Sequence, residues 1–148
     1  ECYDSRGVGQ PEIIEKARSV LLKCRSAVIQ NCLFRGSVLQ AIHIAAEGWW
    51  HEGIACENII IRGNRFVDCG LTGHASVGGV KAEMAVDASS GTPQKHILIE
   101  NNLFDLPGVP HAVSISNAED VTLRGNVYLR CSKPVEIHDC LSVKNEDE

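Results

Sequence analysis

The chain has 148 residues, of which 44% are hydrophobic and 22% charged, and its formal net charge is −5 at pH 7. This length and composition are typical of one folded domain with a buried core. No run of about 18 apolar residues and no signal-peptide pattern occurs, which argues against a membrane span. The negative charge argues against a nucleic-acid partner, because phosphate binding requires an excess of Lys and Arg.

The predicted elements begin with a strand at SVLLKC (19 to 24), after an irregular or partial coil at 1 to 18. A template then recurs: apolar, any, apolar, any, any, Asn or Cys, any, aromatic. Its four copies are AVIQNCLF (27 to 34), IIIRGNRF (59 to 66), ILIENNLF (97 to 104) and VTLRGNVY (121 to 128). The aromatic positions are 32, 38 and 24 residues apart. Such spacing is typical of a solenoid whose longer turns carry loops.

A second short alternating stretch follows each aromatic residue, so each turn is predicted to carry at least two strands. These stretches are AIHIA (41 to 45), EMAVD (83 to 87), AVSIS (112 to 116) and PVEIH (134 to 138). Alternation directs Ile42 and Ile44 inward and His43 outward, and the equivalent positions of the later turns repeat this pattern. Stacked at about 4.8 Å, such turns bury a continuous core that no single turn can form.

One polar position of the template is expected to form a ladder along the stack. Asn64, Asn102 and Asn126 share this position, and Cys32 takes their place in the earliest turn. Asn tolerates the left-handed backbone of a tight corner, and its amide can bond the next Asn along the stack. We therefore predict a corner ladder.

These patterns predict an all-β fold, a right-handed parallel β-helix of about five coils. The whole chain, 1 to 148, is expected to form a single segment, with stacked coils at 19 to 143 and a polar tail at 144 to 148. Because neither end shows an obvious cap, we expect a fragment of a longer β-helix. β-Branched runs followed by Gly and Asn disfavour helices, and the absence of amphipathic helical segments disfavours a βαβ fold.

The seven cysteines are an odd number and follow the repeat rather than a disulfide pattern. Cys69 and Cys131 occupy equivalent positions two coils apart, about 9.6 Å, which is too far for a disulfide. The favoured interpretation is packed thiols. Neither a metal site nor a cofactor is predicted, because no paired metal-ligand spacing occurs.

The segment EGWWHEG (47 to 53) interrupts the repeat and carries the residue types of a sugar-binding site. Trp offers a flat apolar face to a sugar ring, and carboxylates act as general acid and base. Alternatively, the two Trp residues cover the core and the carboxylates are solvated. His43, on the preceding strand, either binds a sugar hydroxyl or is simply solvated. The candidate residues of the segment are Glu47, Trp49, Trp50, His51 and Glu52.

The chain resembles a known enzyme family in the runs WWHEGIACENIIIRGNRF, QKHILIENNLFD and AEDVTLRGNVY. They are similar to the C-terminal β-helix part of the α-1,3-galactosidases of glycoside hydrolase family 110. In that family a Trp-x-Glu-Ser-Gly element precedes an Asn-x-Phe strand. Trp50 and Glu52 match its Trp and Glu, whereas Gly53 and Ile54 replace its Ser and Gly. The resemblance covers roughly residues 17 to 131.

The resemblance implies hydrolysis of a terminal α-linked galactose of a glycan with inversion, in a secreted or periplasmic protein. Inversion requires two carboxyl groups about 6.5 to 9.5 Å apart. Glu52 with Asp87 or Glu83 is the pair expected to be catalytic. The resemblance also implies an acidic pair in coils upstream of this segment, in which case the chain supplies only one wall of the site. Carbohydrate is the expected partner, and the sequence does not specify an oligomeric state.

Two other functions remain open at this point. A noncatalytic β-helix module would present either a carbohydrate-binding surface or a structural spike. A pectate-lyase-like enzyme would need clustered Asp residues for calcium and an Arg base on one outward row. The sequence shows no such cluster.

Overall fold

The computed structural model of the protein describes residues 12–14, 18–46, 55–71, 75–84 and 94–147. All the regular secondary structure in these residues is β-strand. The strands form three sheets, each with five parallel strands. A search of the described residues for a helix able to cross a membrane finds none.

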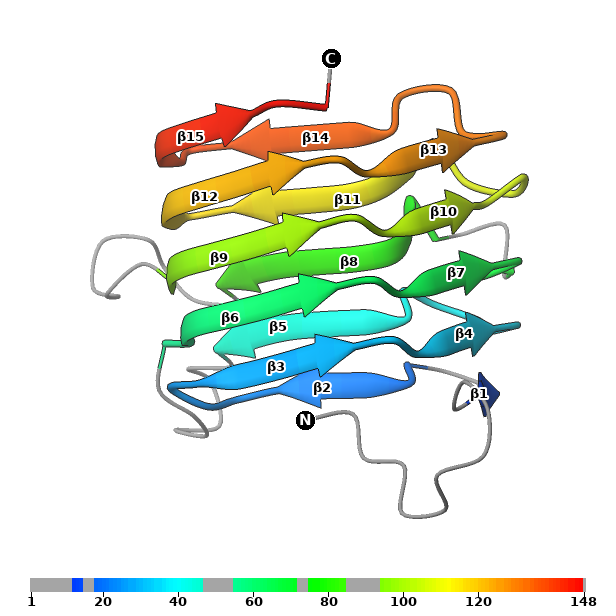
Figure 1. Cartoon of the computed structure of the whole chain (residues 1–148), viewed down its shortest axis with the longest axis horizontal. Coiled ribbons are helices and arrows are strands. Elements are labelled where there is room, and N and C mark those ends of the chain that lie inside the picture. The colour runs from blue at the N-terminus through cyan, green and yellow to red at the C-terminus, as the bar shows by residue number, and fades with distance from the viewer. Residues whose placement is uncertain (1–11, 15–17, 47–54, 72–74, 85–93, 148) are drawn as a thin grey trace.

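The chain visits the three sheets in turn, so every third strand belongs to the same sheet (Figure 1). Sheet A contains β1 (Glu12–Ile14), β4 (Leu33–Arg35), β7 (Arg65–Val67), β10 (Leu103–Asp105) and β13 (Val127–Leu129). Sheet B contains β2 (Val20–Leu22), β5 (Ile42–Ala46), β8 (Val77–Met84), β11 (His111–Ser116) and β14 (Val135–His138). Sheet C contains β3 (Ala27–Gln30), β6 (Glu57–Arg62), β9 (Gln94–Glu100), β12 (Ala118–Arg124) and β15 (Leu141–Asn145).

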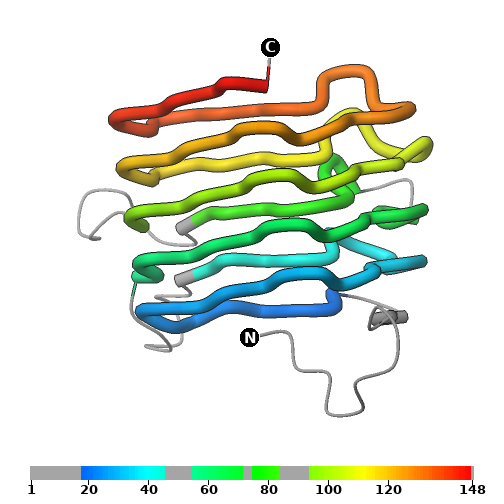
Figure 2. The backbone as a smooth tube through the Cα atoms, in the orientation of Figure 1, coloured from blue at the N-terminus to red at the C-terminus, as the bar shows by residue number. Residues whose placement is uncertain are grey.

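This arrangement is consistent with the predicted parallel β-helix. Figure 2 shows the backbone advancing by one layer with each passage through the three sheets. The predicted inward residues Ile42, Ile44 and Ile115 are fully buried. The corresponding Val135 and Ile137 of the last layer are partly buried and pack against the same core. The alternation of the sequence therefore identified the core face correctly.

The aromatic position of the template forms a stack through sheet A. Phe34 pairs with Phe66, Phe66 with Phe104, and Phe104 with Tyr128. Their ring centroids are 4.9, 4.6 and 5.3 Å apart, with nearly parallel planes. The three Phe side chains have no solvent exposure. The sequence alignment on the aromatic residues thus gave the correct register.

The predicted Asn ladder is present and buried. The backbone N–H and the Nδ2 of Asn64 donate to Oδ1 of Asn102 at 2.9 and 3.1 Å. Asn102 donates in the same way to Asn126, at 3.0 Å for both bonds. The N–H of Cys32 donates to Oδ1 of Asn64 at 3.0 Å. The side-chain amide of each ladder Asn thereby accepts a hydrogen bond from a backbone N–H of the preceding coil.

The reason for Asn at the ladder differs from the one expected. The left-handed residues are those immediately before the ladder, Asn31, Gly63, Asn101 and Gly125, with φ between 53° and 64°. The ladder residues themselves do not adopt positive φ. Asn is therefore used here for its buried hydrogen bonds rather than for its tolerance of the left-handed region.

The carboxylate of Asp147 continues the ladder beyond its last Asn. It accepts bonds from the N–H and Nδ2 of Asn126 at 2.9 and 2.8 Å, and from the Tyr128 hydroxyl at 2.6 Å. Burial and this carboxylate raise the pKa of Tyr128. Asp147 therefore accepts from Asn126 in the same way that each ladder Asn accepts from the preceding coil.

The position of β8 corrects a second expectation. The sequence placed a strand at 83 to 87, whereas β8 runs from Val77 to Met84, and residues 85 to 87 lie outside the described residues. A Cβ on Gly79 would lie 2.4 Å from the Ala112 carbonyl oxygen and 2.6 Å from the Phe104 ring. Gly is poor in strands by propensity, but here close packing requires it.

The six cysteines among the described residues are in two chemical states. Cys24, Cys56, Cys69, Cys131 and Cys140 are free thiols, and burial raises the pKa of Cys56 and Cys69. The prediction of packed thiols therefore holds for these five. It is wrong for Cys32, which is disulfide-bonded.

Candidate functional site

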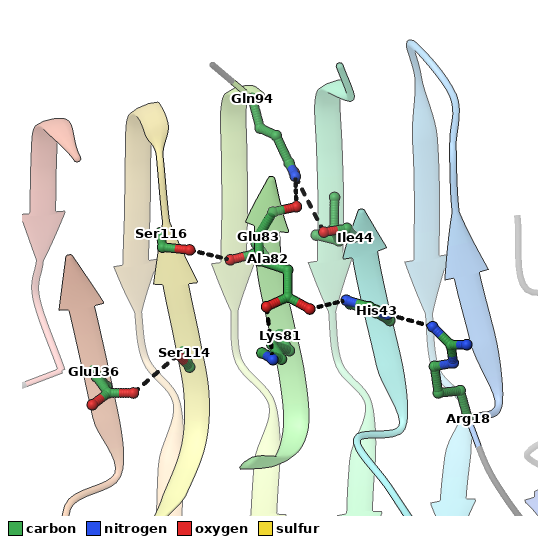
Figure 3. A network of polar contacts seen from close by, with 10 residues as sticks. All are labelled: Arg18, His43, Ile44, Lys81, Ala82, Glu83, Gln94, Ser114, Ser116 and Glu136. Carbon is green, nitrogen blue, oxygen red and sulfur yellow. Dashed lines mark hydrogen bonds and ion pairs between the residues drawn. The ribbon is translucent and has the colours of Figure 1, made fainter. Parts of the chain in front are cut away.

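Of the predicted site residues, the structure describes His43 and Glu83, and it brings them into contact on the outer face of sheet B (Figure 3). His43 lies on β5 and Glu83 on β8, two adjacent parallel strands. His43 is in register with Lys81, and Ala45 with Glu83. The outward side chains of two neighbouring coils therefore meet, as stacking of equivalent faces requires.

The hydrogen bonds of His43 fix its tautomer. Nη1 of Arg18 lies 2.8 Å from Nδ1 of His43, and Nε2 of His43 lies 2.8 Å from Oε1 of Glu83. Because a guanidinium can only donate, Nδ1 must accept, and the ring proton is on Nε2 facing the carboxylate. His43 is only 6% exposed. The interpretation of His43 as a solvated strand residue is therefore wrong: it points outward but is covered by its partners.

Glu83 is held as a carboxylate. Nζ of Lys81 lies 2.7 Å from its second oxygen, Oε2. The hydrogen bond from His43, followed by that from Lys81, lowers the pKa of Glu83 to about 2, although partial burial acts in the opposite direction. Glu83 can accept hydrogen bonds or a proton from a bound molecule, but it is not protonated at neutral pH and so cannot serve there as a general acid.

The depressed pKa predicts a specific pH dependence of stability. Because the folded-state pKa of about 2 lies below the usual 4.5, the ionised carboxylate stabilises the fold above about pH 4.5. This stabilisation is lost as the pH falls through about 2. Urea unfolding of the protein and of Glu83→Gln should therefore show a difference that shrinks on acidification, by on the order of 2 kcal/mol. A difference that does not change with pH would contradict the ionised assignment.

Gln94, the first residue of β9, ties the ends of the two site strands together. Its Nε2 donates to the carbonyl oxygens of Ile44 and Glu83, at 3.1 and 2.9 Å (Figure 3). Its Oε1 is buried and accepts no hydrogen bond from the described residues. A buried amide oxygen without a donor is uncommon, and a water or ligand hydroxyl would satisfy it.

A second polar cluster surrounds Glu136 on the same face. Its Oε2 accepts from the Ser114 hydroxyl at 3.1 Å, and its Oε1 lies 3.1 Å from Nε2 of His138 and 3.6 Å from Nε2 of His111. The hydrogen bond from His138 is the main cause of a lowered pKa at Glu136. Ser114 is in register with Lys81 on one side and Glu136 on the other. The outer face of sheet B thus carries polar side chains on successive coils.

The other candidate residues lie outside the described residues: Glu47, Trp49, Trp50, His51, Glu52 and Asp87. The structure does show where their segments start. Residues 47–54 follow the end of β5, and residues 85–93 follow the end of β8. Ala46 and Met84, the last residues of these strands, are register partners. The two segments therefore leave sheet B from adjacent positions.

Sequence reasoning missed Arg18, Lys81 and Gln94 as parts of the site. The register of Lys81 with His43 could have identified Lys81, but only if the strand had been predicted to begin at Val77. Arg18 lies before β2, and Gln94 is the first residue of β9. No periodic pattern in the sequence identifies a functional side chain at such positions. No three His, Cys, Asp or Glu side chains among the described residues are arranged to hold a metal ion.

Comparison with known proteins matches the chain to alpha-1,3-galactosidases. The chain is 32% identical over 134 residues to alpha-1,3-galactosidase A of Bacteroides fragilis, covering 87% of this chain and 20% of that protein. The corresponding protein of a second strain is 32% identical over 111 residues, covering 72% and 18%. The chain is related in sequence to a glycoside hydrolase. It spans about a fifth of the length of these curated relatives, and no protein-family model matches it.

Proposed function

We propose that the chain forms part of a glycoside hydrolase that removes terminal α-linked galactose from glycans, with the outer face of sheet B as one wall of its site. The observation that carries the proposal is the place of the His43–Glu83 pair. It lies on the two strands from which segments 47–54 and 85–93 start side by side. The sequence relationship to a galactosidase supports the choice of substrate.

The ionised state of Glu83 limits its role in such a reaction. An inverting enzyme needs one protonated carboxyl to protonate the leaving oxygen and one carboxylate to activate water. With a pKa of about 2, Glu83 fits only the second role, or accepts hydrogen bonds from sugar hydroxyls. The general acid is then proposed to be Glu52 or Asp87. Trp49, Trp50, His51 and Glu47 are proposed to contact the sugar, in an extracytoplasmic protein.

The test replaces Glu83 with Gln in the intact protein and measures kcat/KM on an aryl α-galactoside. We expect a fall of at least about tenfold, equivalent to about 1.4 kcal/mol of transition-state stabilisation. Glu119→Gln is the matched control, because Glu119 forms a similar carboxylate pair with Lys95 on sheet C. Circular dichroism would show that both variants remain folded. Full activity in a folded Glu83→Gln variant would exclude Glu83 from the reaction.

The noncatalytic carbohydrate-binding module remains the second candidate, because a carboxylate held by His and Lys is also common in purely structural networks. The binding module would be supported over the hydrolase by two results together. The intact protein would hydrolyse no α-galactoside, and it would bind an α-galactoside in a way that Trp50→Ala weakens.

A further inference from the structure

A groove of about 360 Å³ lies on the outer face of sheet C. Its size falls in the range of small-ligand sites, about 300 to 1,000 Å³. Sheet C faces the viewer in Figure 1 and sheet B lies behind it. The groove is therefore on the opposite side of the stack from the His43–Glu83 pair.

The floor of the groove is apolar and follows the stack. Ile60 of β6, Leu98 of β9 and Thr122 of β12 are register partners on three successive coils. All three are partly buried. Because the sheet is in register, these side chains form a continuous apolar strip that crosses the strands, with successive contacts about 4.8 Å apart.

One side of the groove is lined by polar residues that share an unusual backbone. Asn58, His96 and Asp120 have φ of 53°, 56° and 58° and are all exposed. Nδ1 of His96 lies 2.7 Å from Oδ2 of Asp120. The left-handed region costs a non-Gly residue roughly 1 to 2 kcal/mol. The same polar edge is thus repeated on three coils although each repeat carries a conformational cost.

The other side carries Arg124, whose Nε and Nη2 both lie 2.8 Å from Oε2 of Glu100. This pair holds the guanidinium in place over the sheet while its remaining N–H groups can donate. Among the groove residues there is one cation, Arg124, and one anion, Asp120. Because Arg124 is already paired with Glu100, the groove has no excess of positive charge, and it offers both donors and acceptors beside an apolar floor.

We propose that this groove binds a neutral oligosaccharide at a site separate from the catalytic one. A sugar chain has apolar C–H faces and hydroxyl edges that both donate and accept, which matches an apolar strip between polar sides. The lack of excess positive charge disfavours a nucleic acid or another polyanion. The choice of a galactose-containing oligosaccharide as ligand rests on the proposed function, whereas the location of the groove does not.

The test measures binding of a neutral α-galactosyl oligosaccharide to the intact protein by isothermal titration calorimetry. Asp120→Gly removes one polar side chain, and Gly suits the left-handed backbone, so the fold is not weakened. We expect affinity to fall by about tenfold or more. Ser142→Gly is the matched control, because Ser142 has the same conformation, with φ of 56°, one coil beyond the groove. It should bind within about twofold of the unchanged protein.

Turnover of a short aryl α-galactoside separates this site from the proposed catalytic site. Asp120→Gly should leave that turnover unchanged, whereas Glu83→Gln should lower it without affecting groove binding. The groove proposal is overturned if the oligosaccharide does not bind, if Asp120→Gly binds as tightly as Ser142→Gly, or if binding and aryl galactoside turnover are lost together. If analytical ultracentrifugation showed dimers of the unchanged protein and Asp120→Gly abolished them without a change in sugar binding, the groove would be assigned to a second copy of the chain instead.

Discussion

Asn102→Leu is expected to lower the free energy of unfolding by about 2 to 6 kcal/mol, measured by urea denaturation. Asn102 is 2% exposed. Its Oδ1 accepts from the backbone N–H of Asn64, and its Nδ2 donates to the carbonyl oxygen of Ile61 at 2.9 Å. Leu has the same branched arrangement of heavy atoms but leaves both buried groups unpaired. Each unpaired group costs about 1 to 3 kcal/mol, which gives the expected range.

Asn101→Gly is the matched control for this prediction. Asn101 is the neighbouring residue, exposed, with φ of 53°. Gly is free of strain there, so the change should alter stability by less than about 1 kcal/mol. If Asn102→Leu were as mild as Asn101→Gly, the buried ladder would not be a principal source of stability.

Phe66→Ala is expected to destabilise the protein by about 3 to 5 kcal/mol. Phe66 lies in the middle of the aromatic stack, 4.9 Å from the Phe34 ring and 4.6 Å from the Phe104 ring. It has no solvent exposure. Removing its ring leaves a cavity between two fixed neighbours, and backbone pairing to the adjacent coils prevents collapse.

Phe66→Leu separates the volume of the ring from its stacking. Leu restores most of the apolar volume, so this variant should lose roughly half as much stability as Phe66→Ala. Thermal and urea unfolding of both variants gives the comparison. Equal losses in the two variants would indicate that ring stacking, rather than the filled volume, dominates at this position.

The repeated features of the fold were predictable because they depend on local pattern. Alternation in a strand places every second side chain on the same face, and in-register stacking brings equivalent positions of successive coils together. The aromatic stack through Phe66 and the ladder through Asn102 follow from these two rules. The sequence therefore indicated the core face, the register and the identity of the ladder residues.

The start of β8 was not predictable because the deciding contact is not local. Gly78 and Gly79 give no strand signal, because Gly has a low β-propensity. Glycine is nevertheless required at Gly79 of the strand, because the Ala112 backbone and the Phe104 ring, each more than twenty residues away along the chain, leave no room for a Cβ there. Only the assembled stack reveals that constraint.

By itself, the sequence determined a repeating all-β chain, its inward positions and its Asn ladder, since each depends on residues at fixed positions within the repeated template. It also marked His43 and Glu83 as candidates. Only the tertiary structure decided that these two form a pair, that Lys81 and Arg18 complete it, and that Glu83 is ionised. Their contacts cross between coils of different length, and a carboxylate's pKa is fixed by the donors around it rather than by its place in the sequence.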